Sequence, residues 1–457
     1  MESWELLNKI IDQNLAAETA FDSLTGYGAN VYLVGKALRD SLQGKEPKQL
    51  DLLVTGVTQE DIESALSIQG AHLNSTQNGY NFRFDNYNVN IDLPRVSGIV
   101  DPRIPIEVYL GEQDHSAAAI AYDLSTGQFI DPYSGLSDAA NGVLRPTQAN
   151  SYADSPDHIL NGIALHGEGY LPDSSFVEAI TNHGHGIKDL SPDQLRVSLD
   201  RILRSDDPVR ALNLMKETGI LEYLLPEVAN TMGFDQNNQF HDLELGDHLM
   251  EALRQMVTLS DDPDLRLAAL LHDIGKPDSY WEDEQGHGHY YQDPETGQGM
   301  DHDKVGAEMA RNFMERLNYP ENRIKRVEKL IQLHMQPWWS SEKGARKFYN
   351  TLGGDQDMAN DWVKLRSSDM RGKTNGQMDP QDEQQHQLSF ELLNQVIDKQ
   401  NATNAPSLEI SGYDLMDAGI PQGPEVGRVL SELQEAVDRD PSLNNRETLL
   451  DLARQYA

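Results

Sequence analysis

The chain has 457 residues, which is enough for about three domains with a core each. Hydrophobic residues make up 38% of it, and no apolar run reaches the roughly 18 residues that a membrane-spanning helix needs. The first residues are acidic where a secretion signal would be basic, so we expect a soluble, cytoplasmic protein with no membrane partner. With Cys 0, disulfides, thiolate zinc sites and cysteine nucleophiles are excluded.

The charge of the chain is strongly acidic. Its 74 Asp and Glu against 37 Lys and Arg give a formal net charge of −37. Because nucleic-acid binding rests on Lys and Arg that displace counterions from phosphates, this composition disfavours RNA as a partner. Two explanations remain open, which are the loss of a nucleic-acid-binding role and adaptation to a salty cytoplasm that screens the charge.

The predicted elements divide the chain into a mixed part and a helical part. Residues 30–42 read as a strand, a glycine turn and a helix, and the apolar alternation predicts further strands at 49–56, 80–84, 88–96 and 106–111. From residue 157 to the end most apolar spacing is helical. The polar stretch 372–387 is predicted to be an exposed linker. The fold class is therefore α+β, with an N-terminal mixed α/β domain followed by an all-helical body.

Histidines and aspartates recur at helix ends in the helical part. The run "LAALLHDIGKPDSYW" places a His–Asp pair at the end of an apolar helix, and each of the other members lies near a helix end or an apolar stripe. A metal site needs ligands that converge from several helices, and imidazole with carboxylate suits Mn, Fe, Ni, Co or Mg. The candidate ligands are His248, His272, Asp273, His302, His334 and Asp369.

This ordered set resembles the HD superfamily of metal-dependent phosphohydrolases. The resemblance implies one ion held by His248, His272, Asp273 and Asp369, with Asp273 bridging to a second ion held by His302 and His334. Such an ion acidifies its bound water and makes Asp273 the catalytic centre. Lys276, one turn further on, is a second catalytic candidate that would contact substrate phosphate, although a solvated helix end explains it equally well. His287 and His289 are predicted to lie on a loop, as solvent-exposed residues or as part of a lid.

The N-terminal part resembles the class II tRNA nucleotidyltransferases and their poly(A) polymerase relatives. The segments that carry the likeness are "VYLVGKALRDSLQGKEPKQLDLLVTG", "NIDLPRVSG", "GQFIDPYSGLSDA" and "LSPDQLRVSLDRILRSDDPVRALNLMKETGILEYLLPEV", and "EISGYDLMDAGIPQGPEVGRVLSELQEAV" resembles the tail of CCA-adding enzymes. Bacterial members carry an HD domain in this position. The resemblance implies a head domain at 1–145, a helical neck at 146–235, an HD domain at 236–375 and a helical tail at 376–457.

The transferase residues are where the sequence departs from that family. Gly35, Arg39, Asp40 and Asp51 match the pattern of a glycine turn, an Arg–Asp helix and a metal-binding strand. Gln49 replaces the second carboxylate of that strand, which weakens a Mg²⁺ site. Lys36 replaces the second glycine of the turn, and the Arg-Arg-Asp segment of the family aligns with Gln113, Asp114 and His115.

The base-reading helix of the family departs as well. Its Glu-Asp-x-x-Arg segment and the following arginines align with Asp154, Ser155, His158, Asn161 and Ala164, so no arginine remains there. The similar "DDPVR" at 206–210 belongs to a different helix. Asp92 offers a replacement carboxylate on a neighbouring strand, although an exposed strand acid is the simpler interpretation.

These departures favour hydrolysis over nucleotidyl transfer. The leading hypothesis is an HD-type phosphohydrolase or phosphodiesterase that acts on a nucleotide or an RNA 2′,3′-phosphate end, on a scaffold whose transferase site is degenerate. An active tRNA nucleotidyltransferase is the first alternative, and a non-catalytic nucleotide-binding protein is the second. Transfer of labelled CTP or ATP to tRNA, and metal-dependent phosphate release, would distinguish the three.

Overall fold

The structure is a computed structural model of the whole chain. It describes residues 15–457 apart from 46, 48, 68–73, 76–78, 85–86, 97–98, 149, 236–242, 284–286, 294–296, 374–377, 405–407, 422 and 457. Residues 1–14 of the acidic N-terminal segment therefore lie outside the described part. Within that part, no helix combines the length and the apolar character that crossing a membrane would require.

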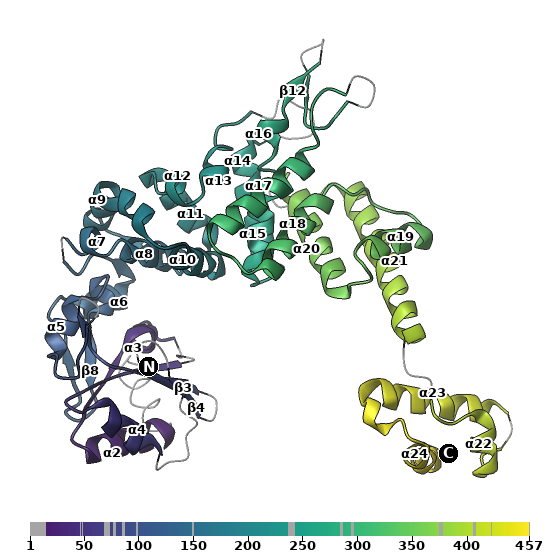
Figure 1. Ribbon diagram of the computed structural model, residues 1–457, viewed down its shortest axis with the longest axis horizontal. Helices are drawn as coiled ribbons and strands as arrows, with labels where there is room; N and C mark the ends of the chain where they lie inside the picture. The colour runs from purple at the N-terminus through teal and green to yellow at the C-terminus, as the bar shows by residue number, and fades with distance from the viewer. Residues whose placement is uncertain are drawn as a thin grey trace. The chain divides into compact units, whose positions relative to one another are not determined.

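The head is a mixed sheet with helices packed against it (Figure 1). Its strand order is β3-β4-β5-β2-β1-β8-β9, in which β2 and β5 run parallel and the other neighbours antiparallel. The strands are β1 (Asn30–Val34), β2 (Gln49–Thr55), β3 (Asn74–Ser75), β4 (Gly79–Phe84), β5 (Tyr87–Asp92), β8 (Ala121–Asp123) and β9 (Gln128–Ile130). The helices are α2 (Leu15–Gly26), α3 (Gly35–Leu42), α4 (Gln59–Ser67), α5 (Ile106–Gly111) and α6 (Gly135–Asn141).

Several short elements accompany the head sheet and the helical neck that follows it. They are β6 (Arg95–Val96), β7 (Ile99–Val100) and η1 (Ser116–Ala118) in the head, and the parallel pair of β10 (Val143–Leu144) and β11 (Leu171–Pro172). The neck holds α7 (Ser151–Asp154), α8 (Asp157–Gly167), α9 (Ser174–His183), η2 (Gly184–Asp189), α10 (Pro192–Arg204), α11 (Pro208–Thr218), α12 (Leu221–Leu224) and α13 (Pro226–Ala229). Helix α10 begins where a capping box between Ser191 and Gln194 satisfies the first free N–H groups. Helices α10 and α11 both pack against α8.

The HD region is a bundle that follows the neck in the chain. It consists of α14 (Leu245–Val257), α15 (Pro263–Leu271), α16 (Lys276–Ser279), α17 (His302–Arg316), α18 (Glu321–Leu333) and the part of α20 (Gln356–Gly372) from Lys364 onward, with a hairpin of β12 (Trp281–Glu282) and β13 (Gly288–His289). Every residue of α15 is buried. Because this helix is covered on all sides, its sequence is mostly apolar, and its two charged residues, Asp264 and Arg266, are hydrogen-bonded inside the protein.

A second compact unit holds residues 336–363 and 379–457, and the head, neck and HD region form the first. Its helices are α19 (Glu342–Thr351), the first part of α20, α21 (Pro380–Asn404), α22 (Gly412–Asp417), α23 (Pro424–Arg439), η3 (Pro441–Leu443) and α24 (Arg446–Tyr456). Trp339, Phe348 and Trp362 stack on one another in its interior. The four-part division of the chain suggested by the family resemblance stays a prediction.

Two predicted elements differ from the structure. Residues 106–111 form helix α5 rather than a strand, because Ile106 and Leu110, four positions apart, are buried on one face after Pro105 sets the entry angle. The polar stretch predicted as a linker is helical from Pro380, where it opens α21 with mostly exposed side chains. The polar composition there reflects a solvated helix face and not a lack of structure.

Candidate functional site

Asp51 lies at the centre of a hydrogen-bond cluster near the start of β2, the middle strand of the head sheet. Its Oδ1 accepts from Gln49 Nε2 at 2.6 Å and from Asn90 Nδ2 at 3.0 Å, and its Oδ2 accepts from the backbone N–H of Lys36 at 3.2 Å. The residue at 49 therefore orients the remaining carboxylate of the strand. Because β2 pairs in parallel with β5, the side chain of Asn90 reaches the same face as Asp51.

Gly35 allows the turn between β1 and α3 to approach this carboxylate. Its φ of 68° lies in the left-handed region, and a Cβ there would stand 2.9 Å from Asp51 Oδ2. Any side chain at this position would therefore strain the backbone and push the Asp51 carboxylate away.

Asp92 brings a second carboxylate to the same strand pair. The prediction that Asp92 is an exposed strand acid is wrong, since its side chain is only partly accessible. Burial, followed by the negative charge of Asp51, raises the pKa of Asp92 to about 6. Two carboxylates close enough to repel one another are the donor set that a divalent cation neutralises, so the residues present fit such an ion. Asp92 thus brings a second negative charge from β5 close enough to interact with Asp51.

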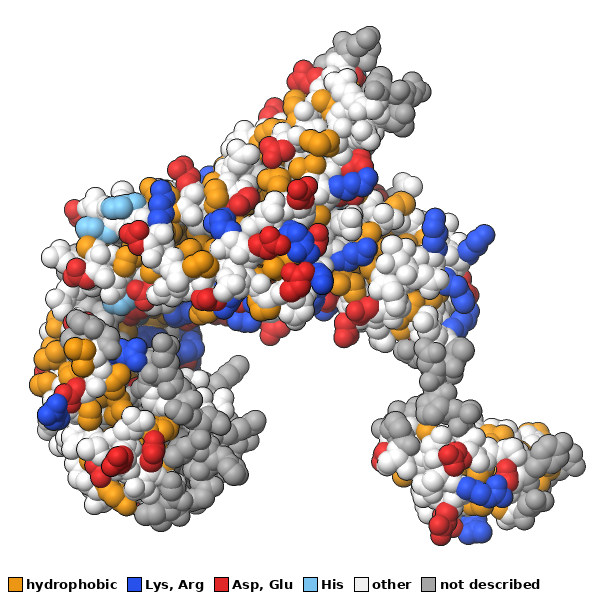
Figure 2. All heavy atoms as spheres, viewed as in Figure 1, with side chains coloured by type: hydrophobic (Ala, Val, Ile, Leu, Met, Phe, Trp, Pro, Cys, Tyr) orange, Lys and Arg blue, Asp and Glu red, His pale blue; other side chains and the backbone are white. Residues whose placement is uncertain are grey.

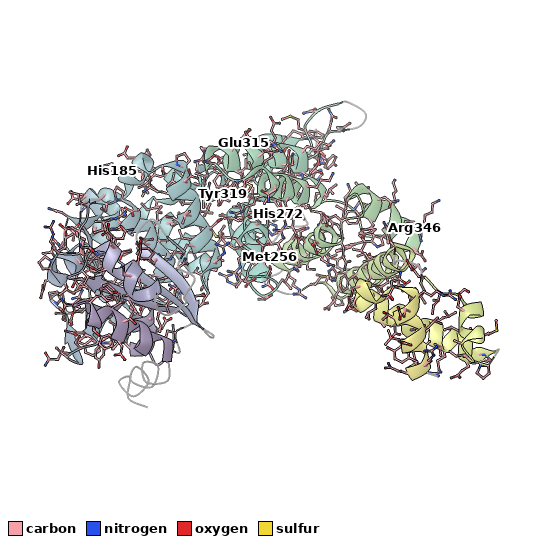
Figure 3. The ribbon with its side chains drawn as sticks, turned by 60° about the horizontal axis from the view of Figure 1, so that its bottom comes forward. His185, Met256, His272, Glu315, Tyr319 and Arg346 are labelled. Carbon is pink, nitrogen blue, oxygen red and sulfur yellow. The ribbon has the colours of Figure 1, made fainter. Side chains whose placement is uncertain are left out.

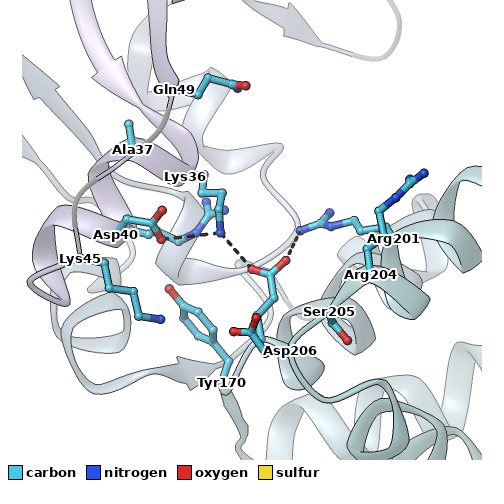
Figure 4. Close-up of a pocket in the computed structure, with 12 residues that line it drawn as sticks. Lys36, Ala37, Asp40, Lys45, Gln49, Tyr170, Arg201, Arg204, Ser205 and Asp206 are labelled. Carbon is cyan, nitrogen blue, oxygen red and sulfur yellow. Dashed lines mark hydrogen bonds and ion pairs between the residues drawn. The ribbon is translucent and has the colours of Figure 1, made fainter. Parts of the chain in front are cut away.

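A pocket of about 620 Å³ opens beside this cluster, between the head and the neck (Figure 4). Gln49 connects the pocket to Asp51, and five cationic side chains line it against three acidic ones. Its lining consists of Lys36, Ala37, Arg39, Asp40, Lys45, Gln49, Glu168, Tyr170, Arg201, Arg204, Ser205 and Asp206. Figure 2 shows Lys and Arg side chains gathered where the neck faces the head. The local charge of this pocket is therefore positive in a chain whose total is strongly negative.

Ion pairs cross the pocket from the head to the neck. Lys36 Nζ lies 3.3 Å from Glu168 Oε2, and Arg201 Nη2 lies 3.9 Å from Glu168 Oε1. Lys36 also lies 3.7 Å from Asp40 on the next turn of α3. Figure 4 draws these pairs as dashed lines, with Arg201 and Arg204 extending from α10.

The neck replaces the missing arginines of α8 from a neighbouring helix. Asn161, which stands at one of those positions, accepts a hydrogen bond from Arg201 Nη1 at 3.0 Å. Sequence reasoning missed Arg201, Arg204 and Glu168 as site residues. The signal available was the spacing of Arg201 and Arg204, three apart in "DRILRSDD", which puts both guanidinium groups on one helix face.

The segment that aligns with the Arg-Arg-Asp of the family, Gln113 to His115, makes its contacts within the head. His115 Nδ1 lies 2.8 Å from Asp114, and both side chains are largely buried. Burial of Asp114 opposes its ionisation, yet the nearby His115 holds its pKa below the usual value. This pair lies in the head and does not line the pocket.

The six candidate metal ligands converge in the HD region. His248 Nε2, His272 Nε2, Asp273 Oδ2 and Asp369 Oδ1 form one group, whose measured separations run from 3.1 to 3.5 Å. All four side chains are buried, and Figure 3 shows His272 inside the bundle. Nitrogen and oxygen atoms at these distances from one another surround a space suited to a cation.

A second group shares Asp273 with the first. Asp273 Oδ1 lies 3.3 Å from His302 Nε2 and 3.3 Å from His334 Nε2. Asp273 Oδ1 and His302 Nε2 are buried and make no hydrogen bond with the described residues. Since a buried unsatisfied oxygen and nitrogen facing one another are costly, a shared cation would satisfy both.

The ring orientations of three histidines suit metal binding. Nδ1 of His272 donates to Ala269 O at 2.9 Å, His334 Nδ1 donates to Ile331 O at 2.7 Å, and His302 Nδ1 donates to Tyr290 O at 2.9 Å. These bonds fix the tautomer whose Nε2 lone pair points into the cluster.

Protons and a cation compete for this cluster. Burial lowers the pKa of His334 to about 4, which keeps its ring neutral. At His272 burial also acts to lower the pKa, but the Asp273 and Asp369 carboxylates outweigh it and raise the value to about 9. A cation would take the place of the His272 proton.

Lys276 is buried and not a solvated helix end, since its Nζ lies 2.7 Å from Asp273 Oδ2. Burial opposes ionisation of Asp273, but Lys276 and then His272 hold its pKa well below the usual range. His287 and His289 lie at the β12–β13 hairpin, where Asp283 Oδ2 pairs with both at 3.2 and 3.0 Å. The structure does not bring these two histidines into the metal cluster.

Three family models match consecutive parts of the chain. Residues 31–145 match a poly A polymerase head domain, residues 170–232 a probable RNA and SrmB-binding site of polymerase A, and residues 245–374 an HD domain. The chain therefore contains a poly A polymerase head domain, an RNA-binding domain and an HD domain, in this order. The family resemblance and the α+β fold expected from the sequence are thereby confirmed.

A curated member of this family and several solved structures are similar to the chain. An A-adding tRNA nucleotidyltransferase of Deinococcus radiodurans is 31% identical over 249 residues, which is 53% of this chain and 54% of that protein. The chain thus spans about half the length of that relative. A CCA-adding enzyme with ATP covers 100% of this chain and 99% of its own at a TM-score of 0.57 and 17% identity.

Two further structures show the same fold. A tRNA nucleotidyltransferase complexed with a primer tRNA and an incoming ATP analog gives a TM-score of 0.56 at 17% identity, over 83% of this chain and 99% of its own. A Thermotoga maritima CCA-adding enzyme complexed with tRNA gives 0.54 at 17% identity, over 100% and 98%.

These relatives overturn the leading functional hypothesis. The similar proteins are nucleotidyltransferases, so the interpretation as an HD phosphohydrolase on an inactive transferase scaffold is wrong. That interpretation counted each substitution separately, whereas Asp92 brings a second carboxylate near Asp51 and Arg201 contacts Asn161 from a neighbouring helix. The argument that net charge disfavours tRNA is wrong too, because charge acts locally and the pocket is cationic.

Proposed function

We propose that this protein transfers nucleotides from a nucleoside triphosphate to the 3′ end of tRNA. The observation that carries the proposal is the cationic pocket beside the Asp51 and Asp92 carboxylates, between the head and α10. A tRNA substrate would place the protein in the cytoplasm. Because the curated relative is A-adding, addition of A to a tRNA that ends in CC is the step to test first.

Different residues of this site would bind the cation, orient its carboxylate ligand and hold the triphosphate. Asp51 and Asp92 would hold a divalent cation, preferably Mg²⁺, which when bound offsets charge on the reacting phosphate. The N–H of Lys36 and the side chain of Gln49 orient the Asp51 carboxylate. Cations of α3 and α10 would hold the triphosphate across the pocket, which aligns its first phosphorus with the tRNA hydroxyl.

The experiment is incorporation of labelled ATP and CTP into tRNA lacking its terminal A or its terminal CCA, with Mg²⁺ present. We expect label at the 3′ end with the wild-type protein and a loss of at least about 10³-fold with Asp51→Asn, which removes the charge of a cation ligand but keeps the size of the side chain. Asp123→Asn, on the edge-side strand β8, is the matched control. Absence of incorporation at enzyme concentrations equal to those of tRNA would refute the proposal.

The HD cluster is proposed as a separate metal centre. His248, His272, Asp273 and Asp369 would hold one divalent ion among Mn, Ni, Fe, Co and Mg, and Asp273 with His302 and His334 would hold a second. Lys276 and Arg366 balance the charge of the two carboxylates. Metal binding is the only role that we assign to this cluster.

A further inference from the structure

Glu168 connects two cations that come from opposite sides of the pocket. It follows α8 directly, and its two carboxylate oxygens face different partners, Lys36 of the head at 3.3 Å and Arg201 of the neck at 3.9 Å. A single carboxylate therefore occupies the position at which both cations converge. The phosphate oxygens of a nucleotide have the same charge and the same preference for Lys and Arg donors.

The two ion pairs are weak enough to exchange. The side chain of Lys36 is 60% exposed, that of Arg201 is 40% exposed and that of Glu168 is 24% exposed. Water screens pairs with this exposure, so each contributes little and can be replaced by a stronger anion. A polyphosphate carries several negative charges within the span of one such pocket, whereas Glu168 carries one.

Lys36 also occupies a special place in the chain. It follows Gly35 at the turn where the resemblance to nucleotidyltransferases implies a second glycine, and its N–H contacts Asp51 while its side chain enters the pocket. One residue therefore joins the cation-binding carboxylate to the polyphosphate side of the site.

We propose that Lys36 and Arg201 bind the polyphosphate of the incoming nucleotide and that Glu168 is their displaceable counter-ion in the empty pocket. This inference rests on the proposed function and names residues within that site. Glu168 keeps the two cations extended across the pocket, and an incoming polyphosphate must displace it. Nucleotide affinity is therefore set by competition between Glu168 and phosphate.

The test measures binding of inorganic tripolyphosphate and of ATP to the full-length protein by calorimetry. Glu168→Gln keeps the size and removes the charge, so it should tighten tripolyphosphate binding about two- to tenfold, which is the combined effect expected of two exposed pairs. Lys36→Met should weaken it about two- to tenfold for the same reason. Glu178→Gln, an exposed residue of α9, makes the same charge change outside the pocket lining and should leave the affinity unchanged.

The outcomes separate this inference from the proposed function. If the wild type does not bind tripolyphosphate, or if Glu168→Gln binds it no more tightly than Glu178→Gln does, the role of Glu168 is refuted. If Glu168→Gln tightens binding but the wild type transfers no label to tRNA, the counter-ion role stands and the proposed function fails.

Discussion

Substitution of Arg266 by Met tests how the HD region holds the pocket in place. Arg266, on α15, is buried, and its Nη1 donates to Leu203 O at 2.6 Å and to Ser205 O at 3.0 Å. These carbonyls end α10, the helix that carries Arg201 and Arg204 into the pocket. A guanidinium group at a helix C-terminus also complements the helix dipole.

The magnitude follows from the bonds that are lost. Arg266 makes three hydrogen bonds from a charged group, the third being from Nε to Ser260 O at 2.9 Å. Bonds from charged donors contribute about 1.5 to 3 kcal/mol each, and burial of the charge opposes part of this, so Arg266→Met should lower the free energy of unfolding by about 3 to 5 kcal/mol. With a urea dependence of about 3 kcal/mol per molar, the midpoint falls by about 1 M or more.

The assay combines urea unfolding with hydrogen exchange of the amides at 201–206. In Arg266→Met these amides should lose protection well below the midpoint, and the KM for the nucleotide should rise with a smaller change in kcat. Arg266→Lys retains the charge but has fewer donors, so its urea midpoint should lie between those of the wild type and Arg266→Met. Arg254→Met, which changes a half-exposed arginine of α14, is the control and should shift the midpoint little. An unchanged midpoint together with unchanged protection at 201–206 would refute the reasoning.

Three further outcomes are expected. Because the pKa of Asp92 is raised to about 6, its contribution to stability is present below about pH 4 and is lost as the pH rises through about 6. In chelator, urea unfolding of Asp92→Asn should therefore lack about 1 to 2 kcal/mol of the fall in unfolding free energy that the wild type shows over this window. Asp369→Asn should lower the metal content of the protein and remove the fall in Tm that a chelator causes, whereas Asp247→Asn, exposed on α14, should do neither. Gly35→Ala should cost about 1 to 2 kcal/mol in urea unfolding and, by displacing Asp51, should abolish labelling of tRNA; a Gly35→Ala protein with wild-type rate would show that this turn tolerates a side chain.

The division into a mixed head and a helical body could be predicted from the sequence alone, because strand and helix periodicities are local properties of the chain. The resemblance to known families could be read there too, and the six residues that it indicates in the HD region lie together in the structure, while their role in metal binding stays a prediction. The strand predicted at 106–111 is wrong because a run of six apolar residues is too short to distinguish the helical period of 3.6 residues from the strand period of two.

The effect of the substitutions at Gln49 and Asn161 can be judged only from the tertiary structure. In the sequence, Gln49 and Asn161 count as charged residues that have been lost, because comparison with the family pattern treats each position separately. In space, Asp92 comes to Asp51 through the parallel pairing of β5 with β2, and Arg201 comes to Asn161 through the packing of α10 on α8. The net charge misled for the same reason, since electrostatic attraction depends on distance and the pocket gathers cations from segments far apart in the chain.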